Sequence, residues 1–270
     1  MSDSLRAQNG LVFLQSEAMI ETSQFMKTRM VVHELPDEPA IDSKAVHIWF
    51  CDLDGYGTSK ITYSALSASE LERVKRLKSL ENRRRLVNRF TFVRNVLGNI
   101  ADIDPAVLEF CQSYRGKPQL AYPANANKEK PRKLDFSISH TENILALAVV
   151  FDGTVGIDIE AVRTDLDFFD IAMKHFTIEN LELLRSMSSN KAAITFYRLW
   201  TRREALAKMD GSGIVRQSDT KSMTDLDLAL YSFQFKMDNK EIVGALARNS
   251  EISHYVTSDD ICPVHSISVL

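Results

Sequence analysis

The pattern of apolar and polar positions predicts a strand, two helices and a shorter strand in the first part of the chain. Residues 45–52 are dense in β-branched and aromatic side chains, which is typical of a strand. From 67 to 77 apolar residues recur at three-residue spacing behind an N-capping serine, and a second helix is predicted from about 81 to 100. Asp104-Pro105 ends that helix, and 107–111 is expected to be a short strand.

The second part of the chain repeats this outline. Residues 121–135 are polar and contain prolines, so they are expected to form a loop that leads into 136–140, ahead of a buried strand over 144–151. Asp152-Gly153 predicts a tight turn into a strand over 154–160. The remaining predictions are helices over 166–188, broken near Thr177, and over 190–209, ended by Gly211 and Gly213, a hairpin over 227–248 that turns at Asp238-Asn239, and a last strand over 265–270.

This order predicts an α+β protein of two similar lobes. We expect an N-terminal extension over 1–43, which carries two apolar patches and ends in a proline-bearing linker. The N-terminal lobe would then span 44–152 and the C-terminal lobe 153–270.

Composition excludes few functions, but it bears on the partners and the cellular compartment of the protein. The chain has 270 residues, 44% of them hydrophobic, and a formal net charge of −3, so no nucleic-acid partner is expected. The longest apolar run, 144–151, is too short to span a bilayer, so no membrane partner is expected either. Cys51, Cys111 and Cys262 show no metal-ligand spacing and are interpreted as reduced thiols in a cytoplasmic protein. We expect a monomer.

The sequence Gly156-Ile-Asp-Ile-Glu160 places two carboxylates on one side of a strand. Positions i and i+2 of a strand face the same way, so Asp158 and Glu160 lie together. Two unpaired carboxylates repel each other, and a hard cation such as Mg²⁺ between them removes the repulsion. Solvated acids at an exposed strand end are the alternative interpretation.

The segment Trp200-Thr-Arg-Arg-Glu-Ala-Leu-Ala-Lys208 places a carboxylate and an ammonium on one face of a helix. Trp200, Glu204 and Lys208 are spaced by four residues. Glu204 could add a third carboxylate to a metal site, and Lys208 could hold a phosphate. A surface Glu–Lys pair is the alternative interpretation.

Two shorter segments also carry polar side chains that could reach a cleft. Ser139 and His140 end the stretch Phe-Ser-Ile-Ser-His at 136–140, directly before the buried strand. No G-x-S-x-G motif accompanies them, so a hydrolase nucleophile is not indicated, and a structural histidine is the alternative. In Gly-Lys-Pro at 116–118, glycine and proline are expected to fix a loop that presents Lys117 outward, although a plain surface turn fits the tripeptide too.

The order and spacing of these four segments resemble the Sfp-type 4′-phosphopantetheinyl transferases. The resemblance covers about residues 45–248 and is most specific in the pair GIDIE and W-x-x-x-E-A-x-x-K with its following G-x-G. It implies the fold of that family, two pseudo-symmetric α+β lobes with coenzyme A in the cleft between them. It also implies a reaction in which the 4′-phosphopantetheine arm of coenzyme A passes to a serine of an apo acyl or peptidyl carrier protein, releasing 3′,5′-ADP.

The resemblance also implies roles for the carboxylates and the lysine of the helix. Asp158, Glu160 and Glu204 are expected to ligate Mg²⁺, for which Mn²⁺ is an alternative. Lys208 is expected to contact the phosphates. Glu204, or a water on the metal, would accept the proton of the attacking serine.

By the same resemblance, four residues are expected to bind the coenzyme. Ser139 and His140 would contact a phosphate, including the 3′-phosphate, and Lys117 would lie by the adenosine end. Arg85 corresponds to the phosphate-binding arginine of the family.

One departure from the family pattern concerns the residue before the helix glutamate. The family usually has lysine there, whereas this chain has Arg203, which keeps the charge but is less able to move a proton. Two other functions remain open from the residues alone. They are a Mg²⁺-dependent phosphohydrolase that uses the same carboxylates, and a catalytically impaired scaffold that binds coenzyme A or a carrier protein.

Overall fold

The computed structural model describes residues 45–56, 63–121, 134–211, 228–237 and 240–249, together with the backbone of three short N-terminal strands. The predicted strand over 265–270, the turn at Asp238-Asn239, Gly213 and Cys262 lie outside the described residues. The N-terminal strands are β1 (Ala7–Gln8), β2 (Leu11–Val12) and β3 (Met30–His33), of which β3 pairs in parallel with β4 (Val46–Asp52).

The helices begin and end where capping residues allow it. In α1 (Ala68–Arg76) the Ser67 hydroxyl accepts from the Glu70 amide at 3.3 Å, and the Glu70 carboxylate accepts from the Ser67 amide at 2.7 Å, which is a capping box. The longest helices are α2 (Leu80–Ala101) and α5 (Ser189–Asp210). Gly211 ends α5 in a left-handed conformation with φ 72°, which glycine adopts without strain.

The remaining elements follow the predicted order with small shifts. The predicted strand over 107–111 begins later, because Pro105 starts a 3₁₀ turn over Pro105–Val107 that delays it. The stretch predicted to lead into the buried strand is itself a strand, since its apolar and polar residues alternate. The bounds are β5 (Glu109–Gln112), β6 (Pro118–Ala121), β7 (Leu134–Thr141), β8 (Ile144–Phe151), β9 (Thr154–Ala161), α3 (Phe169–His175), α4 (Ile178–Arg185), β10 (Leu228–Met237) and β11 (Lys240–Asn249).

The two larger sheets repeat one strand order. In the first, β4 pairs with β8 and β8 pairs with β7, and in the second, β9 pairs with β11 and β11 pairs with β10, all antiparallel. Among these three strands of each sheet, therefore, the one that comes last in the chain, β8 or β11, lies in the middle. The fold is α+β, as the sequence predicts, whereas the lobe boundaries at 43/44 and 152/153 stay predictions.

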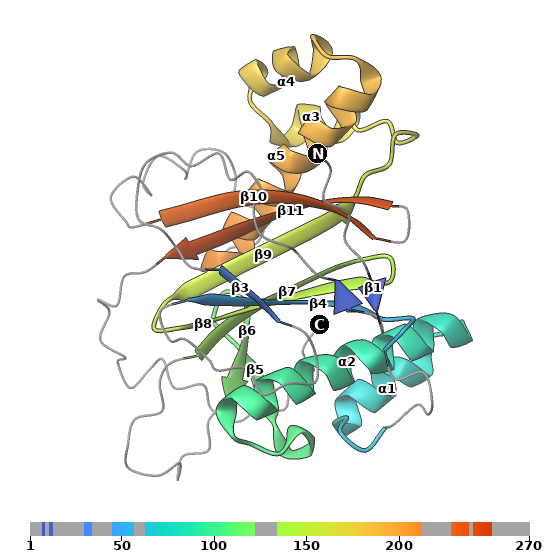
Figure 1. Ribbon diagram of the computed structural model, residues 1–270, viewed down its shortest axis with the longest axis vertical. Helices are drawn as coiled ribbons and strands as arrows, with labels where there is room; N and C mark the ends of the chain where they lie inside the picture. The colour runs from blue at the N-terminus through green and yellow to red at the C-terminus, as the bar shows by residue number, and fades with distance from the viewer. Residues whose placement is uncertain are drawn as a thin grey trace.

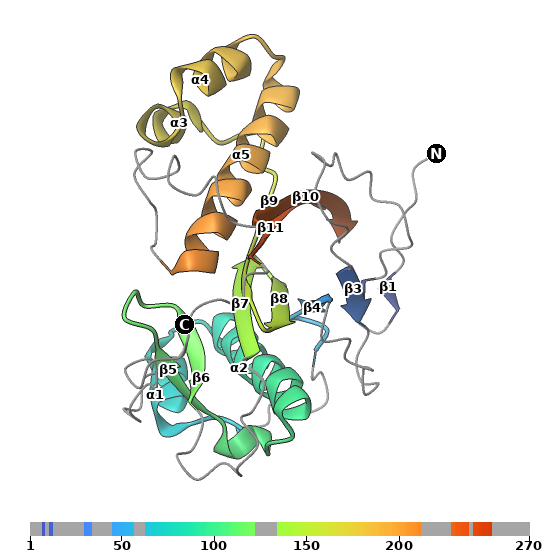
Figure 2. The same cartoon turned by 90° about the vertical axis from the view of Figure 1, so that its left-hand side faces the viewer.

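The two sheets share one hydrophobic core. Inward-facing side chains of β4 and β8, such as Phe50 and Ala146, belong to the same buried cluster as Ile157 of β9 and Leu246 of β11. The outer face of the first sheet packs against α2, and the outer face of the second packs against α5 (Figure 2). Figure 1 shows α3 and α4 at the opposite end of the molecule from α1 and α2. None of the described helices has the length and apolar character needed to cross a membrane.

Candidate active site

The site forms where α5 lies directly on β9, and Gly156 permits that approach. A Cβ atom at Gly156 would lie 1.9 Å from the Ala205 carbonyl oxygen and 2.5 Å from the Met209 amide nitrogen. No side chain fits in that space, so the glycine of the strand motif lets the helix backbone touch the strand. This contact brings the helix face with Glu204 and Lys208 over the carboxylates of β9.

Asp158 is the most buried of the three predicted metal ligands. Its residue is 4% exposed, and its Oδ1 accepts from the Lys208 ammonium at 2.8 Å and from the Ser139 hydroxyl at 2.8 Å. Its Oδ2 is buried and has no hydrogen-bond partner among the described residues. Burial raises the pKa of Asp158, whereas Lys208 and Ser139 act in the opposite direction.

Glu160 and Glu204 are half-buried, and the negative charge of Asp158 repels their ionised forms. Burial first, and Asp158 second, raise the pKa of Glu160 to about 7. The same two causes, in the same order, raise the pKa of Glu204, whose Oε1 is buried without a hydrogen-bond partner among the described residues. The three carboxylates thus form one electrostatic cluster that holds more negative charge than its surroundings stabilise.

The chemistry of this cluster fits a divalent cation, although its ligands are not preassembled. Within the described residues, no three His, Cys, Asp or Glu side chains are grouped so that they could hold a metal ion as they stand. The Lys208 ammonium supplies the positive charge that faces Asp158 instead. The two buried oxygens without partners, on Asp158 and Glu204, are acceptors of the kind that Mg²⁺ binds.

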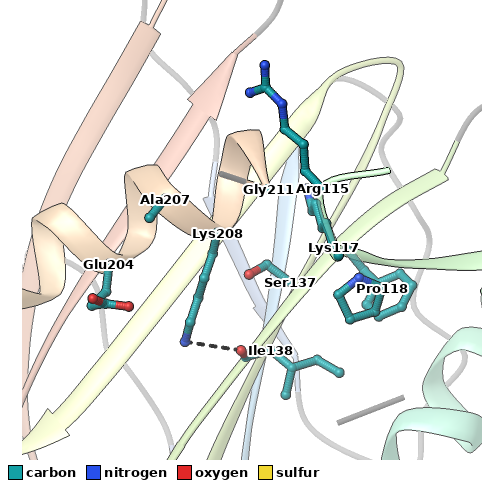
Figure 3. Close-up of a pocket in the computed structure, with 11 residues that line it drawn as sticks. Arg115, Lys117, Pro118, Ser137, Ile138, Glu204, Ala207, Lys208 and Gly211 are labelled. Carbon is teal, nitrogen blue, oxygen red and sulfur yellow. Dashed lines mark hydrogen bonds between the residues drawn. The ribbon is translucent and has the colours of Figure 1, made fainter. Parts of the chain in front are cut away.

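A pocket opens beside this cluster and is lined by residues from three of the four sequence motifs (Figure 3). Its walls come from the turn at 115–118, from β7 at 136–138, and from Glu204 and Lys208, which project from the same side of α5. Lys208 also donates to the carbonyl oxygen of Ile138 at 3.3 Å. An anionic group in this pocket would meet an ammonium that is already oriented by two acceptors.

His140 is hydrogen-bonded to an arginine for which the sequence predicts no role. Arg89 of α2 places its Nη1 3.0 Å from His140 Nε2. Partial desolvation of the ring, and then the charges of Arg89 and Lys208, lower the pKa of His140 to about 4. The imidazole is therefore neutral at neutral pH and accepts from the guanidinium. Only the spacing of α2 could have indicated Arg89, which is one turn beyond the predicted Arg85.

Ser139 and Lys117 are both buried and are hydrogen-bonded within the protein. The Ser139 hydroxyl is buried and donates its one hydrogen bond to Asp158. The Lys117 side chain is 8% exposed rather than presented outward, and its ammonium pairs with Asp135 and donates to the carbonyl oxygens of Val155 at 2.9 Å and Met209 at 3.2 Å. All three N–H donors of the ammonium have acceptors within the protein, so this lysine joins the start of β6 to β7, β9 and the end of α5.

Arg85 and Arg203 occupy the edge of the region. Arg85 donates to Asp54 Oδ2 at 2.5 Å and forms an ion pair with Glu81 at 2.6 Å, so two carboxylates hold its guanidinium. Arg203 donates to the carbonyl oxygen of His175 at 2.8 Å, at the end of α3. That bond holds the Arg203 guanidinium against the end of α3.

Comparisons with known proteins point to one family. A sequence model of the 4′-phosphopantetheinyl transferase superfamily matches residues 154–257, which include β9 and α5. The chain is 32% identical over 185 residues to the 4′-phosphopantetheinyl transferase HetI of Nostoc sp., and the match covers 67% of this chain and 76% of HetI. It is 24% identical to the 4′-phosphopantetheinyl transferase Sfp of Bacillus subtilis, over 76% of this chain and 82% of Sfp. It is 30% identical to the 4′-phosphopantetheinyl transferase AcpT of Escherichia coli, over 38% of this chain and 49% of AcpT.

The superfamily match falls on the part of the chain that carries the carboxylate cluster. The likeness to HetI extends over most of both sequences. With these matches and the α+β fold, the chain belongs to the 4′-phosphopantetheinyl transferase superfamily and is a transferase.

Proposed function

We propose that this protein transfers the 4′-phosphopantetheine arm of coenzyme A to a serine of an apo acyl or peptidyl carrier protein, with Mg²⁺ as cofactor. The serine oxygen forms a bond to the β-phosphorus of coenzyme A, and the bond from that phosphorus to the bridging oxygen breaks. The products are the holo carrier protein and 3′,5′-ADP, and the serine proton passes to a base in the site.

The observation that carries this proposal is the pair of buried oxygens, Asp158 Oδ2 and Glu204 Oε1, that lack partners among the described residues beside an anion-sized pocket. A buried carboxylate oxygen without a donor is costly. Asp158, Glu160 and Glu204 would hold a divalent cation, which supplies charge neutralisation for the pyrophosphate when bound. The pKa of Glu160, raised to about 7 by burial and by the charge of Asp158, supports the same assignment, because a bound cation would stabilise the ionised carboxylate.

The side chains of the chain itself would orient the donor and move the proton. Lys208 extends from α5 to the pocket and would bind the phosphates there. Glu204 lines the pocket and would accept the serine proton. Phosphoryl transfer depends chiefly on positioning and charge neutralisation, which these residues provide.

Further phosphate contacts are assigned to His140 and Arg89. They adjoin each other at 3.0 Å, and Arg89 keeps its charge at any physiological pH. A phosphate at His140 would raise the pKa of the imidazole and turn it into a second donor. Arg85, one helical turn away, stays a predicted contact of the 3′-phosphate. We place the reaction in the cytoplasm, because Cys51 and Cys111 are buried as thiols rather than joined in a disulfide.

The test is an incubation of the purified protein with coenzyme A, Mg²⁺ and an apo carrier protein. We expect the carrier to gain the mass of one phosphopantetheine group while one equivalent of 3′,5′-ADP appears, and a carrier with alanine at its acceptor serine to gain nothing. Asp158→Ala should keep the fold and abolish transfer. Release of inorganic phosphate without a mass gain would indicate the phosphohydrolase, and binding without either product would indicate the scaffold.

A further inference from the structure

The two sheets meet along β7 and β9 without a backbone ladder. Alternate side chains of β7 accept instead from alternate amide groups of β9. Asp135 Oδ2 accepts from Val155 N at 2.8 Å, and Ser137 Oγ accepts from Ile157 N at 3.1 Å. In the same register Ser139 Oγ accepts from Ile159 N at 3.2 Å, and Thr141 Oγ1 accepts from Ala161 N at 3.1 Å. We call these four side chains, 135, 137, 139 and 141, the β7 seam.

Two hydroxyl groups of the β7 seam also donate a hydrogen bond, and in each case the acceptor is a predicted metal ligand. Ser139 donates to Asp158 Oδ1 at 2.8 Å. Thr141 donates to Glu160 Oε2 at 3.4 Å. Each hydroxyl therefore accepts from the amide of one β9 residue and donates to the side-chain carboxylate of the β9 residue that precedes that amide.

Ser137 repeats the first bond without the second. The residue before Ile157 is Gly156, which has no side chain to receive a proton. The Ser137 hydroxyl thus supports the backbone of β9 in the way that Ser139 does, but it orients no carboxylate. The chain itself provides a matched control within one strand.

The donated proton decides which oxygen of Asp158 is left for another partner. A serine hydroxyl can donate one hydrogen bond, and Ser139 donates it to Oδ1, which also accepts from Lys208. Oδ2 is then the oxygen without a partner among the described residues. Because Ser139 is itself 5% exposed and held by Ile159 N, the carboxylate has little freedom to rotate.

We propose that Ser139 and Thr141 are positioning residues that orient the carboxylates of Asp158 and Glu160 for a divalent cation. This inference rests on the proposed function, because it presumes that these carboxylates bind the metal. It gives Ser139 a role other than direct contact with coenzyme A. Hydrogen bonds to metal-ligating carboxylates commonly tune metal affinity in this way.

The test measures Mn²⁺ affinity rather than turnover. Mn²⁺ is titrated into the full chain with saturating coenzyme A and no carrier protein, and free Mn²⁺ is followed by electron paramagnetic resonance. We expect Ser139→Ala to weaken Mn²⁺ binding by about tenfold, the lower end of the range for groups that orient ligands. Ser137 lines the pocket but orients no carboxylate, so with coenzyme A kept saturating Ser137→Ala should stay within about twofold of the parent Mn²⁺ affinity, although it too removes one acceptor from a β9 amide. Urea unfolding of both variants should give similar losses of stability.

A second pair of variants separates the hydroxyl from the packing of the side chain. Thr141→Val keeps the shape and removes the donor, whereas Thr141→Ser keeps the donor. We expect weaker Mn²⁺ binding in Thr141→Val and recovery in Thr141→Ser, with a smaller effect than at Ser139 because the bond is longer. This pair also decides the question if Ser139→Ala fails to fold.

The outcomes distinguish the inference from the function on which it rests. Parent-like affinity in Ser139→Ala, equal losses in Ser139→Ala and Ser137→Ala, or equal affinities in the two Thr141 variants would overturn the positioning role and leave the metal site standing. A parent chain that binds no Mn²⁺ would overturn the proposed metal site together with the inference.

Discussion

At the scale of single residues, Glu160 gives the site a pH dependence. Its pKa of about 7 means that it is largely protonated at pH 6 and largely ionised at pH 8. A metal must displace that proton, so we expect Mn²⁺ affinity to be about tenfold weaker at pH 6 than at pH 8. Titrations of Mn²⁺ at both pH values check this, and Glu160→Gln should show a flatter dependence. Equal affinities at the two pH values would contradict the prediction.

The same shift has the opposite consequence for the metal-free fold. The folded protein keeps the Glu160 proton up to a pH of about 7, whereas the unfolded chain loses it near the ordinary value of 4.5. Because the unfolded state ionises first, this group makes the metal-free chain less stable as the pH rises through that window. Saturating Mg²⁺ should remove this loss.

Glu204 and its neighbour Arg203 are expected to differ sharply in importance. Glu204→Gln removes a proposed metal ligand and the proposed base together, so we expect it to be nearly inactive at little cost in stability. Arg203→Lys restores the residue usual in the family and should stay within about tenfold of the parent rate, or about 1.4 kcal/mol in the barrier. Steady-state kinetics on carrier protein measure both. An active Glu204→Gln beside an inactive Arg203→Lys would show that the other face of α5 is catalytic.

Lys117 is expected to act on stability more than on coenzyme binding. Its ammonium and the Asp135 carboxylate are buried together, with side chains 8% and 7% exposed. Lys117→Ala would leave that carboxylate without its positive partner, which costs roughly 3–5 kcal/mol in the free energy of unfolding. Urea unfolding measures the loss, and the double variant with Asp135→Asn should recover part of it. A variant with parent stability and a raised KM for coenzyme A would instead support the predicted contact with adenosine.

At the scale of elements, the contact between α5 and β9 depends on one glycine. Gly156→Ala would place a methyl group 1.9 Å from the Ala205 carbonyl oxygen, so the helix must move away. We expect a loss of about 2 kcal/mol or more in the free energy of unfolding, together with lower activity, since Glu204 and Lys208 move with the helix. Urea unfolding and kinetics check both effects.

A second substitution tests the cause of that loss. Ala205→Gly should not rescue Gly156→Ala, because the clash is with the helix backbone rather than with the alanine methyl group. A full rescue would mean that side-chain packing, and not the close backbone contact, sets the position of α5.

At the scale of the whole molecule, the shared core predicts that both halves unfold together. Strands from both sheets contribute to one buried cluster, so neither sheet keeps its core when the other melts. The chain has 2 tryptophans, Trp49 in β4 and Trp200 in α5. Fluorescence of Trp49→Phe and Trp200→Phe therefore reports each half separately, and we expect each variant's fluorescence and circular dichroism midpoints to coincide. Two separate transitions would show independently stable lobes.

Features that depend on neighbours along the chain could be predicted from the residues alone. Strand and helix positions follow from apolar periodicity, and the start of α1 follows from Ser67 as N-cap. The proposed metal ligands could also be predicted, because a strand aligns Asp158 with Glu160, and a helix aligns Glu204 with Lys208. Both alignments are local geometry, which each segment carries wherever it lies in the fold.

The hydrogen-bond partners of the other polar side chains depend on the tertiary structure. Lys117 donates to Met209, which is 92 residues away along the chain. Ser139 donates to Asp158, 19 residues away, and Arg89 donates to His140, 51 residues away. No local pattern specifies such partners, because they depend on how the sheets and α5 pack. A buried lysine or serine bonds to whichever acceptors packing places nearby, since an unsatisfied polar group in the interior is costly. Residue type and spacing therefore predicted the chemistry of this site, and the packing of β7, β9 and α5 assigned each side chain its partner.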